Sequence, residues 1–399
     1  MSLTIVDLFA GAGGLSCGFL QEGFDIALAV EKDAWAADTY VSNHLNTNFH
    51  CADIATLPDS FFLKYKGVDV VMGGPPCQGF SISASNRRDP NDPRNLLYLE
   101  FLRAVELMKP RVVLIENVRE IQKFRLADGR LLCSDIQERL FKMGFHSHIL
   151  TLNANFFGVP QSRIRTFILA AKDERRLQGT VAMLSNQNQI QLLRSSRNLQ
   201  SDFCLWDAIS DLPEVEPWKV TEEDFQKYAT LPKNQFQKML RKDSDAVLNH
   251  VPMRHTPRMI ERFKLLLDTS KLVGLNMPSE LTPRVRGKPE LESHKVYDQN
   301  HRKLDPIKPS PTITASFYSS FIHPFQPRNL TVREAARLQS FPDSYAFKGK
   351  RTTLSKKLLT RKGEVADLYL DQFNQVGNSV PPLLAAHLAF EIKNLLNYE

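Results

Sequence analysis

A cysteine, a glutamate and two arginines are the residues of this chain whose types and settings suit covalent chemistry. Cys77 follows Gly-Gly-Pro-Pro at positions 73–76, where glycines and prolines end the apolar run 68–72 and fix the following loop. A thiol presented on a rigid loop at a strand end is suited to act as a nucleophile. Taken alone, a cysteine is more often a small buried hydrophobe, and the Pro-Pro-Cys-Gln setting is what favours the nucleophile.

Acidic and basic groups follow other predicted strands. The apolar run 112–115 leads into Glu116, and Arg163 and Arg165 are two positions apart, which predicts that they share one face of a strand. In a doubly wound sheet such strand ends converge on one crevice. A thiol, a carboxyl and two guanidinium groups there would form a covalent site for an anionic or flipped-base substrate.

The first part of the chain has the pattern of a nucleotide cradle. A strand over 3–9 is followed by the small residues 10–14 and by a helical pattern that ends near Gly23. The next strand ends at Glu31 and the third at Asp53, where the carboxylates would suit ribose hydroxyls and an adenine amino group. Ordinary packing of the small residues and solvated carboxylates are the alternatives, and these segments alone leave both open.

Further elements continue the α/β pattern to about residue 172. We predict a helix over 97–108, a strand over 112–115, a helix opened by a capping box at 134–137 and ended by Gly144, and strands over 146–152 and 165–171. The polar loop 83–95 is predicted to close over a substrate. From Glu174 the period is lost, and the irregular basic module that follows suits either groove and phosphate contacts or a solvated insertion.

Regular structure is predicted again from residue 310. A capping box from Thr331 to Glu334 opens a helix that ends at Pro342, and a turn over 375–382 precedes a final apolar helix through Leu395. Between them lies a basic stretch, 348–362, which suits a phosphate-contacting arm or a solvated loop.

Composition excludes several classes of protein. The 399 residues carry a formal net charge of +7, which favours a polyanion as partner. The five cysteines are odd in number and form no C-x-x-C pair, so neither a disulfide framework nor a zinc site is indicated and a reducing cytosol fits best. No apolar run is long enough for a transmembrane helix, and a first strand beginning at Leu3 leaves no room for a signal peptide.

Six of these stretches, in this order, resemble the signature motifs of the DNA cytosine-5 methyltransferase family, of the bacterial restriction-modification type. They are Asp7–Gly14, Pro75–Gln78, Glu116–Val118, Gln161–Arg165, Arg333–Pro342 and Gly377–Val380. The resemblance covers residues 1 to about 172 and about 308 to 399. It implies a doubly wound, Rossmann-like α/β methyltransferase domain with a second, smaller target-recognition domain. The expected division is a catalytic domain over 1–175, completed by 370–399, and a DNA-reading domain with hinge over 176–369.

The resemblance also implies a mechanism. Cys77 would add to C6 of a cytosine flipped out of a specific short duplex sequence, and C5 would then take a methyl group. Glu116 would bind N3 and the exocyclic amino group, while Arg163 and Arg165 would supply positive charge. Three further residues would line the base pocket: Pro76, Gln78 and Ser81. No residue is identified as the base that removes the C5 proton.

S-adenosylmethionine is the cofactor that the resemblance implies, and no metal is expected. The residues implied around it come from both ends of the chain. They are Phe9, Ala10, Gly11, Gly13, Gly14, Leu15, Glu31, Lys32, Asp53, Ile54, Pro75, Leu97, Asn378 and Ser379.

The expected partner is double-stranded DNA, read by a monomer in the cytoplasm of a bacterium or its phage, associated with the nucleoid. Two other functions remain open: an RNA (tRNA) cytosine-5 methyltransferase, disfavoured by the Gly-Phe-Ser ending at 79–81, and a catalytically silent DNA-binding paralogue, disfavoured by the retained Cys77 and Glu116. The recognition sequence, and whether a cognate restriction endonuclease accompanies the protein, are not determined by the sequence.

Overall fold

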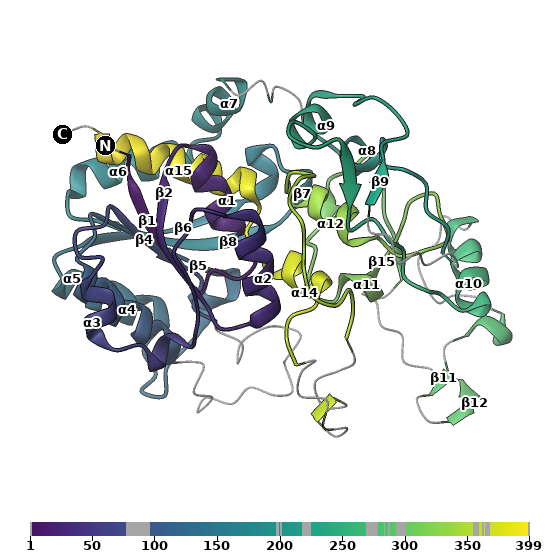
Figure 1. The fold of residues 1–399 in the computed structure, drawn as a ribbon, viewed down its shortest axis with the longest axis horizontal. Helices are drawn as coiled ribbons and strands as arrows, with labels where there is room; N and C mark the ends of the chain where they lie inside the picture. The colour runs from purple at the N-terminus through teal and green to yellow at the C-terminus, as the bar shows by residue number, and fades with distance from the viewer. Residues whose placement is uncertain are drawn as a thin grey trace.

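The chain folds into two lobes that share the C-terminal segments (Figure 1). The computed structural model describes residues 2–76, 96–196, 199, 202–217, 225–268, 278–282, 284–285, 288–292, 301–353, 359–360, 363 and 368–397. The first lobe is built on a seven-stranded sheet, and the second holds shorter helices and two-stranded sheets.

The central sheet has the strand order β3-β2-β1-β4-β5-β8-β6. Its strands are β1 (Thr4–Leu8), β2 (Asp25–Glu31), β3 (Phe49–Cys51), β4 (Val70–Gly73), β5 (Val112–Val118), β6 (His146–Asn153) and β8 (Ile164–Ala171). The first five strands of this order run parallel, and β8 pairs antiparallel with both β5 and β6. Five parallel strands in the order 3-2-1-4-5 are typical of a Rossmann-like α/β domain. The predicted fold class is therefore confirmed.

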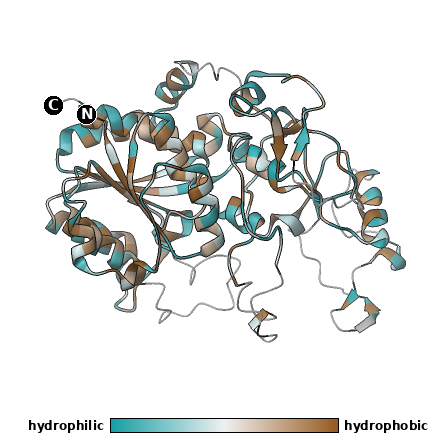
Figure 2. Cartoon of the chain, in the orientation of Figure 1, coloured by the Kyte–Doolittle hydropathy of each residue, from teal (hydrophilic) through white to brown (hydrophobic). Residues whose placement is uncertain are grey.

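Helices cover both faces of this sheet because successive strand residues point to opposite sides. Ile5 belongs to the hydrophobic cluster that includes α1 (Gly14–Gln21) and α15 (Pro382–Asn397), whereas Val6 belongs to the cluster on the other face. That second cluster includes α4 (Leu97–Met108) and α5 (Leu132–Lys142). The hydrophobic residues concentrate in the central strands (Figure 2).

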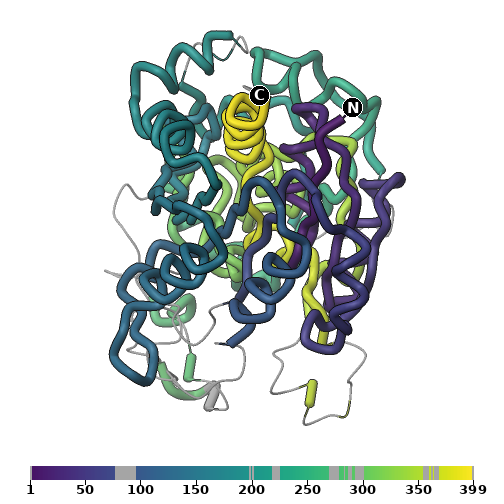
Figure 3. Tube along the Cα trace, turned by 90° about the vertical axis from the view of Figure 1, so that its left-hand side faces the viewer, coloured from purple at the N-terminus to yellow at the C-terminus, as the bar shows by residue number. Residues whose placement is uncertain are grey.

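The C-terminal helix returns to the beginning of the chain. Helix α15 packs against α1, so that the yellow end of the chain lies beside its purple start (Figure 3). Gly18 of α1 makes this approach close: a Cβ there would lie 2.4 Å from the Cβ of Ala385. The predicted final helix is present, and it packs against the first helix of the chain in the first lobe.

The remaining elements are short. Those of the first lobe are α2 (Ala34–Asn43), η1 (Ile54–Thr56), α3 (Asp59–Leu63), η5 (Arg119–Lys123), η6 (Ala154–Phe157), β7 (Gln161–Ser162), α6 (Glu174–Ser185) and α7 (Gln187–Ser196). Those that follow are α8 (Leu205–Ile209), β9 (Phe225–Lys227), α9 (Gln235–Leu240), β10 (Ala246–Leu248), α10 (Pro257–Asp268), η7 (Ser279–Leu281), β11 (Arg284–Val285), β12 (Lys288–Glu292), β13 (Arg302–Lys303), β14 (Ser310–Pro311), α11 (Phe317–Ser320), β15 (Phe321–Ile322), α12 (Val332–Leu338) and α14 (Gln372–Asn378).

Three local predictions differ from the structure. Helix α5 begins at Leu132, so Ser134 lies inside the helix and does not cap it. The chain after Glu174 is helical, because α6 buries Leu177, Thr180 and Leu184 against partners that include α15. The turn predicted from residue 375 is helical up to Asn378. In contrast, the capping box of α12 is confirmed, since the Thr331 side chain accepts from the Glu334 N–H and the Glu334 carboxylate accepts in return.

Candidate functional site

The carboxyl ends of the parallel strands bring the predicted site residues to one edge of the sheet. Strand β1 leads into the loop 9–13, β2 ends at Glu31, and β4 leads into Gly74 and the two prolines. Glu116 lies near the end of β5, the next strand of the sheet. The convergence predicted from strand ends is therefore present among the described residues.

The loop between β1 and α1 is a left-handed backbone turn. Phe9, Gly11 and Gly13 have φ of 60°, 54° and 85°, a region that favours glycine. The Ala10 N–H donates to the Val30 carbonyl at 3.1 Å, and the Gly13 N–H donates to the Ala10 carbonyl at 2.9 Å. A Cβ on Gly11 would meet nothing within 4 Å, so there is open space beside this turn.

Glu31 fastens this loop to the end of β2. One carboxylate oxygen accepts the Gly11 N–H at 2.9 Å, and the other accepts the N–H groups of Lys32 and Asp33, each at 2.9 Å. Burial raises the pKa of Glu31, while these backbone donors oppose the rise. The carboxylate is thus held in a fixed orientation before any ligand binds.

The predicted adenine-side residues lie next along the sheet edge. Lys32 forms an ion pair with Asp53 at 3.4 Å, and both side chains are more than a third exposed. The other Asp53 oxygen accepts the Ala55 N–H at 3.1 Å, so that Asp53 caps the start of η1. The first residue of η1, Ile54, is buried. Because Asp53 follows β3 as a cap, its carboxylate orientation is fixed by local backbone.

The first and last predicted cofactor segments are in contact. A Cβ on Gly14 would lie 2.3 Å from the Val380 carbonyl oxygen and 3.3 Å from the Ser379 Cβ. Ser379 is buried and donates to the Gln375 carbonyl at 2.7 Å, whereas Asn378 is exposed. Leu97, at the start of α4, is buried.

These features fit an adenosine-type cofactor with an amino-acid tail. Open space lies beside the Gly11 backbone, a fixed carboxylate stands at the end of the second strand, and the N-cap residue of α1, Gly13, has no side chain with which to cap the helix. Uncapped N–H groups at a helix start favour an anionic group such as a carboxylate.

The loop stem that precedes Cys77 is pressed against Glu116. A Cβ on Gly73 would lie 2.0 Å from the Leu8 carbonyl oxygen, and one on Gly74 would lie 2.9 Å from a Glu116 carboxylate oxygen. The Asn117 side-chain amide donates to the Pro75 carbonyl at 2.9 Å. At position 73 only glycine fits, because a Cβ there would overlap the backbone of β1. Cys77, Gln78 and Ser81 lie outside the described residues.

Glu116 and Arg165 form the charged pair of the site. Arg165 Nε lies 3.0 Å from Glu116 Oε1, and the two side chains are 12% and 13% exposed. Strand register explains the pair, because Glu116 is opposite Phe167 and Arg165 is therefore its diagonal neighbour on the same face. Burial raises the pKa of Glu116, and the positive charges of Arg165 and Arg163 oppose that rise.

Arg163 is placed differently from the prediction that both arginines share one strand face. It lies between β7 and β8, and its side chain is fully buried. The guanidinium donates to the carbonyl oxygens of Ile313, Gly377 and Ser379 at 2.6, 2.9 and 2.9 Å. These contacts join it to the final turn of the chain.

Sequence reasoning missed Tyr345. This buried tyrosine reaches the loop between β1 and α1 and donates a hydrogen bond to the Ala12 carbonyl. Its position just after the late helix motif is the only signal that the sequence offers. Across the part of the chain that the structure describes, no group of His, Cys, Asp and Glu side chains could hold a metal ion, and none of its helices is long and apolar enough to cross a membrane.

Comparison with known proteins gives a consistent result. The family model of the C-5 cytosine-specific DNA methylases matches residues 3–394. The type II methyltransferase M.DdeI of Desulfomicrobium norvegicum is 41% identical over 403 positions, covering 99% of this chain and 91% of that protein. The type II methyltransferase M1.HphI of Haemophilus parahaemolyticus is 32% identical, covering 98% of this chain and 86% of that protein.

A similar solved structure extends the comparison to the fold. A prophage-encoded protein of E. coli, solved as a candidate DNA modification methyltransferase, superposes with a TM-score of 0.70 at 25% identity, covering 99% of this chain and 100% of that chain. From the matched motifs, the sheet order and these comparisons together, this chain belongs to the family of C-5 cytosine-specific DNA methylases.

Proposed function

We propose that this enzyme transfers a methyl group from S-adenosylmethionine to C5 of a cytosine that is flipped out of a specific short DNA duplex sequence. The half-buried Glu116–Arg165 pair carries the proposal, because its carboxylate lies against Gly74, three residues before Cys77. A carboxyl and a guanidinium side by side can engage the polar edge of a pyrimidine.

The proposed reaction begins with the Cys77 thiolate, which forms a bond from Sγ to C6 of the ring. Glu116, whose pKa burial raises, holds or donates a proton at N3 as negative charge develops on the ring. C5 then accepts the methyl group, Glu116 takes back any proton that it gave to N3, the C5 proton leaves to a base, and the S–C6 bond breaks to restore the thiolate. The cofactor, when bound, supplies the methyl group.

In this proposal the cofactor residues divide by position. Gly11 to Leu15 receive the methionine portion, Glu31 receives the ribose, and Phe9, Asp53 and Ile54 contact the adenine. Ala10 and Lys32 are further residues of the pocket. Pro75, Leu97, Asn378 and Ser379 complete the pocket. Support comes from the Gly14–Ser379 contact and from the fixed Glu31 carboxylate.

The two arginines receive separate roles. Arg165, partner of Glu116, would touch the base, with Pro76, Gln78 and Ser81 as further pocket residues. Arg163 adds positive charge near Glu116 and, through its three carbonyl contacts, positions the segments around Ile313 and Gly377.

The expected division is a catalytic domain over 1–175 with 370–399 and a DNA-reading domain over 176–369. The boundary at residue 175 falls inside helix α6 (Glu174–Ser185), which packs against α15 and β6, so we propose that the catalytic domain extends through residue 185 and that the DNA-reading module begins after it. We propose a monomer acting on duplex DNA in the cytoplasm, at the nucleoid; the net charge of +7 supports an anionic partner. The type II names of the relatives support a restriction-modification context and hence a cognate endonuclease.

The test uses plasmid DNA of mixed sequence, incubated with enzyme and S-adenosylmethionine and then bisulfite-sequenced. Protected cytosines recurring in one short sequence are expected for the wild type and for Cys204→Ala, a cysteine at the start of α8 that is not among the proposed site residues. Cys77→Ala should protect none.

Transfer RNA transcripts are run in parallel. Protection confined to RNA would replace the DNA proposal by the RNA alternative, and protection of neither would favour the silent paralogue. DNA containing 5-fluorocytosine should trap a covalent complex with the wild type and not with Cys77→Ala.

A further inference from the structure

A tyrosine from the far end of the chain holds one peptide of the loop between β1 and α1. The Tyr345 hydroxyl donates to the Ala12 carbonyl, and its oxygen lies 3.0 Å from His44 Nε2. On the other side of the same peptide, the Gly13 N–H donates to the Ala10 carbonyl at 2.9 Å. The Ala12–Gly13 peptide is therefore fixed at both its polar ends.

Counting protons assigns the direction of this chain of hydrogen bonds. A phenol has one proton, and the Ala12 carbonyl can only accept, so the hydroxyl proton of Tyr345 points to Ala12. The phenol oxygen can then only accept from His44, so Nε2 carries the ring proton and Nδ1 carries none. The same imidazole also has a hydrogen bond to the Gly13 backbone. Nδ1 is buried and has no hydrogen-bond partner among the described residues, which fits a ring nitrogen that carries no proton. Burial lowers the pKa of His44 to about 4, which keeps the ring neutral.

The loop has little room to move away from this contact. A Cβ on Gly13 would lie 2.5 Å from His44 Nε2 and 2.6 Å from the Tyr345 hydroxyl. The His44 and Tyr345 side chains thus pack against Gly13, the residue of positive φ that precedes α1.

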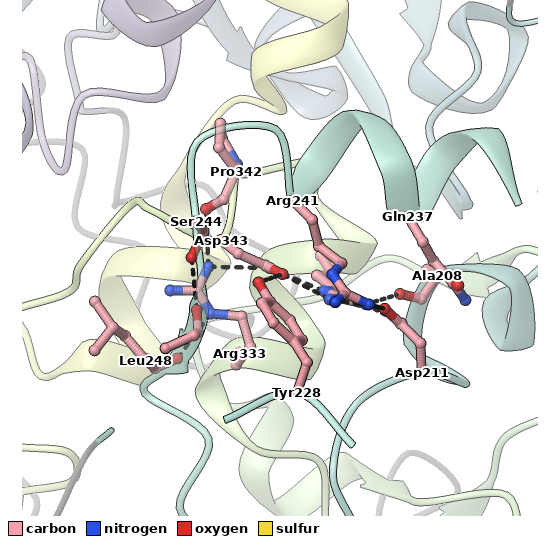
Figure 4. A network of polar contacts seen from close by, with 12 residues as sticks. Ala208, Asp211, Tyr228, Gln237, Arg241, Ser244, Leu248, Arg333, Pro342 and Asp343 are labelled. Carbon is pink, nitrogen blue, oxygen red and sulfur yellow. Dashed lines mark hydrogen bonds and ion pairs between the residues drawn. The ribbon is translucent and has the colours of Figure 1, made fainter. Parts of the chain in front are cut away.

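Tyr345 is itself held by the second lobe. Arg333 of α12 donates to the Tyr345 carbonyl at 2.6 Å and to the Pro342 carbonyl at 2.9 Å. Asp343, two residues earlier, pairs with Arg337 at 2.6 Å and accepts from the Tyr228 hydroxyl at 2.6 Å. Figure 4 shows Arg333, Asp343 and Tyr228 gathered in this network, with Asp211 and Arg241 beside them. The backbone of Tyr345 is thus held by the second lobe, while its hydroxyl group binds the loop between β1 and α1.

We propose that Tyr345, with His44, is a positioning residue for the cofactor loop: it sets the Ala12–Gly13 peptide in the orientation that binds S-adenosylmethionine. The inference rests on the proposed function for the identity of the ligand. Removing the hydroxyl takes away the donor to the buried Ala12 carbonyl and one partner of the His44 imidazole, so the loop rearranges and its affinity for the cofactor falls.

The experiment compares Tyr345→Phe with Tyr228→Phe, which loses a hydroxyl from the same network and has no described contact with the loop. S-adenosylmethionine binding is measured by calorimetry, and KM and kcat by methyl transfer to plasmid DNA. We expect Tyr345→Phe to raise Kd and KM for S-adenosylmethionine about 10- to 100-fold, with kcat at saturation within about twofold of wild type. Tyr228→Phe should leave Kd unchanged even where it lowers the melting temperature.

A second pair of variants keeps the test valid if Tyr345→Phe does not fold. His44→Gln retains an N–H donor near the Nε2 position and His44→Leu removes it, so only His44→Leu should weaken cofactor binding. Equal Kd values for wild type, Tyr345→Phe and His44→Leu would overturn the inference. A wild-type enzyme that does not bind S-adenosylmethionine at all would overturn the proposed function instead, so the two failures are distinguishable.

Discussion

Arg163 and Ser379 are 216 residues apart in sequence, and the Arg163 guanidinium donates a 2.9 Å hydrogen bond to the Ser379 carbonyl. The same guanidinium binds the Gly377 carbonyl, so one buried cation fastens the last turn before α15 to the middle of the chain. This relationship separates the roles of the two motif arginines and suggests the first prediction.

Arg163→Ala should destabilise the fold more than it impairs a step of catalysis. Three buried carbonyls lose a charged donor, and hydrogen bonds to charged groups contribute about 1.5–3 kcal/mol each, so we expect the free energy of unfolding to fall by about 3 kcal/mol or more. Urea unfolding measures it. The control is Arg176→Ala, which removes a solvent-exposed ion pair with Asp173. It should lower the free energy of unfolding by less than about 1 kcal/mol.

Arg165→Met should instead alter the pH dependence of catalysis. The pKa of Glu116 is raised by burial and held down by Arg165, so removing that charge should raise this pKa further. The limb of the pH–rate profile that reports Glu116 should move to higher pH, and single-turnover rates should fall about 100-fold or more at constant cofactor affinity. An unmoved limb would show that another group titrates there.

The helical glycines provide a matched pair of substitutions. Gly18→Ala in α1 would place a Cβ 2.4 Å from the Cβ of Ala385 and should destabilise the protein by about 1–3 kcal/mol, since α1 and α15 must separate. Gly179→Ala in α6 meets nothing within 4 Å and should stabilise it by about 0.5–1 kcal/mol. Thermal unfolding of both variants measures the difference; a gain from Gly18→Ala would contradict the close packing.

The second lobe should be sensitive to acid. Burial lowers the pKa of His250 and His255 to about 4 and of His323 to about 3, beside the Arg328–Glu334 ion pair. A histidine whose folded pKa lies below its unfolded value of 6.5 binds more protons when unfolded, so stability is full above about pH 6.5 and is lost as pH falls toward 4.

For His250, which donates or accepts at both ring nitrogens, a shift from 6.5 to about 4 corresponds to about 3 kcal/mol. Urea unfolding at pH 7.5 and pH 5 should show about 2 kcal/mol of this loss, since the full loss is reached only near pH 4. His250→Gln should reduce the difference between the two pH values, and an equal difference would assign the acid sensitivity to other groups.

The sequence by itself determined the order of the strands along the chain and the residues at their ends. Alternation in β1 and the glycines after it, the strand-end Glu31 and Glu116, and the capping box at Thr331 are local patterns, and local backbone preferences decide them. For the same reason six short motifs sufficed to indicate the family.

Only the tertiary structure decided which of these residues touch one another. Arg163 and Arg165 have the same spacing as any strand pair, yet one reaches Ser379 and the other Glu116, because the chain leaves the sheet between β7 and β8. Helix α6 has a weak pattern that becomes a helix face once α15 packs against it. Tyr345 reaches Ala12 across 333 residues, and no local pattern records a contact between segments that meet only when both lobes have folded.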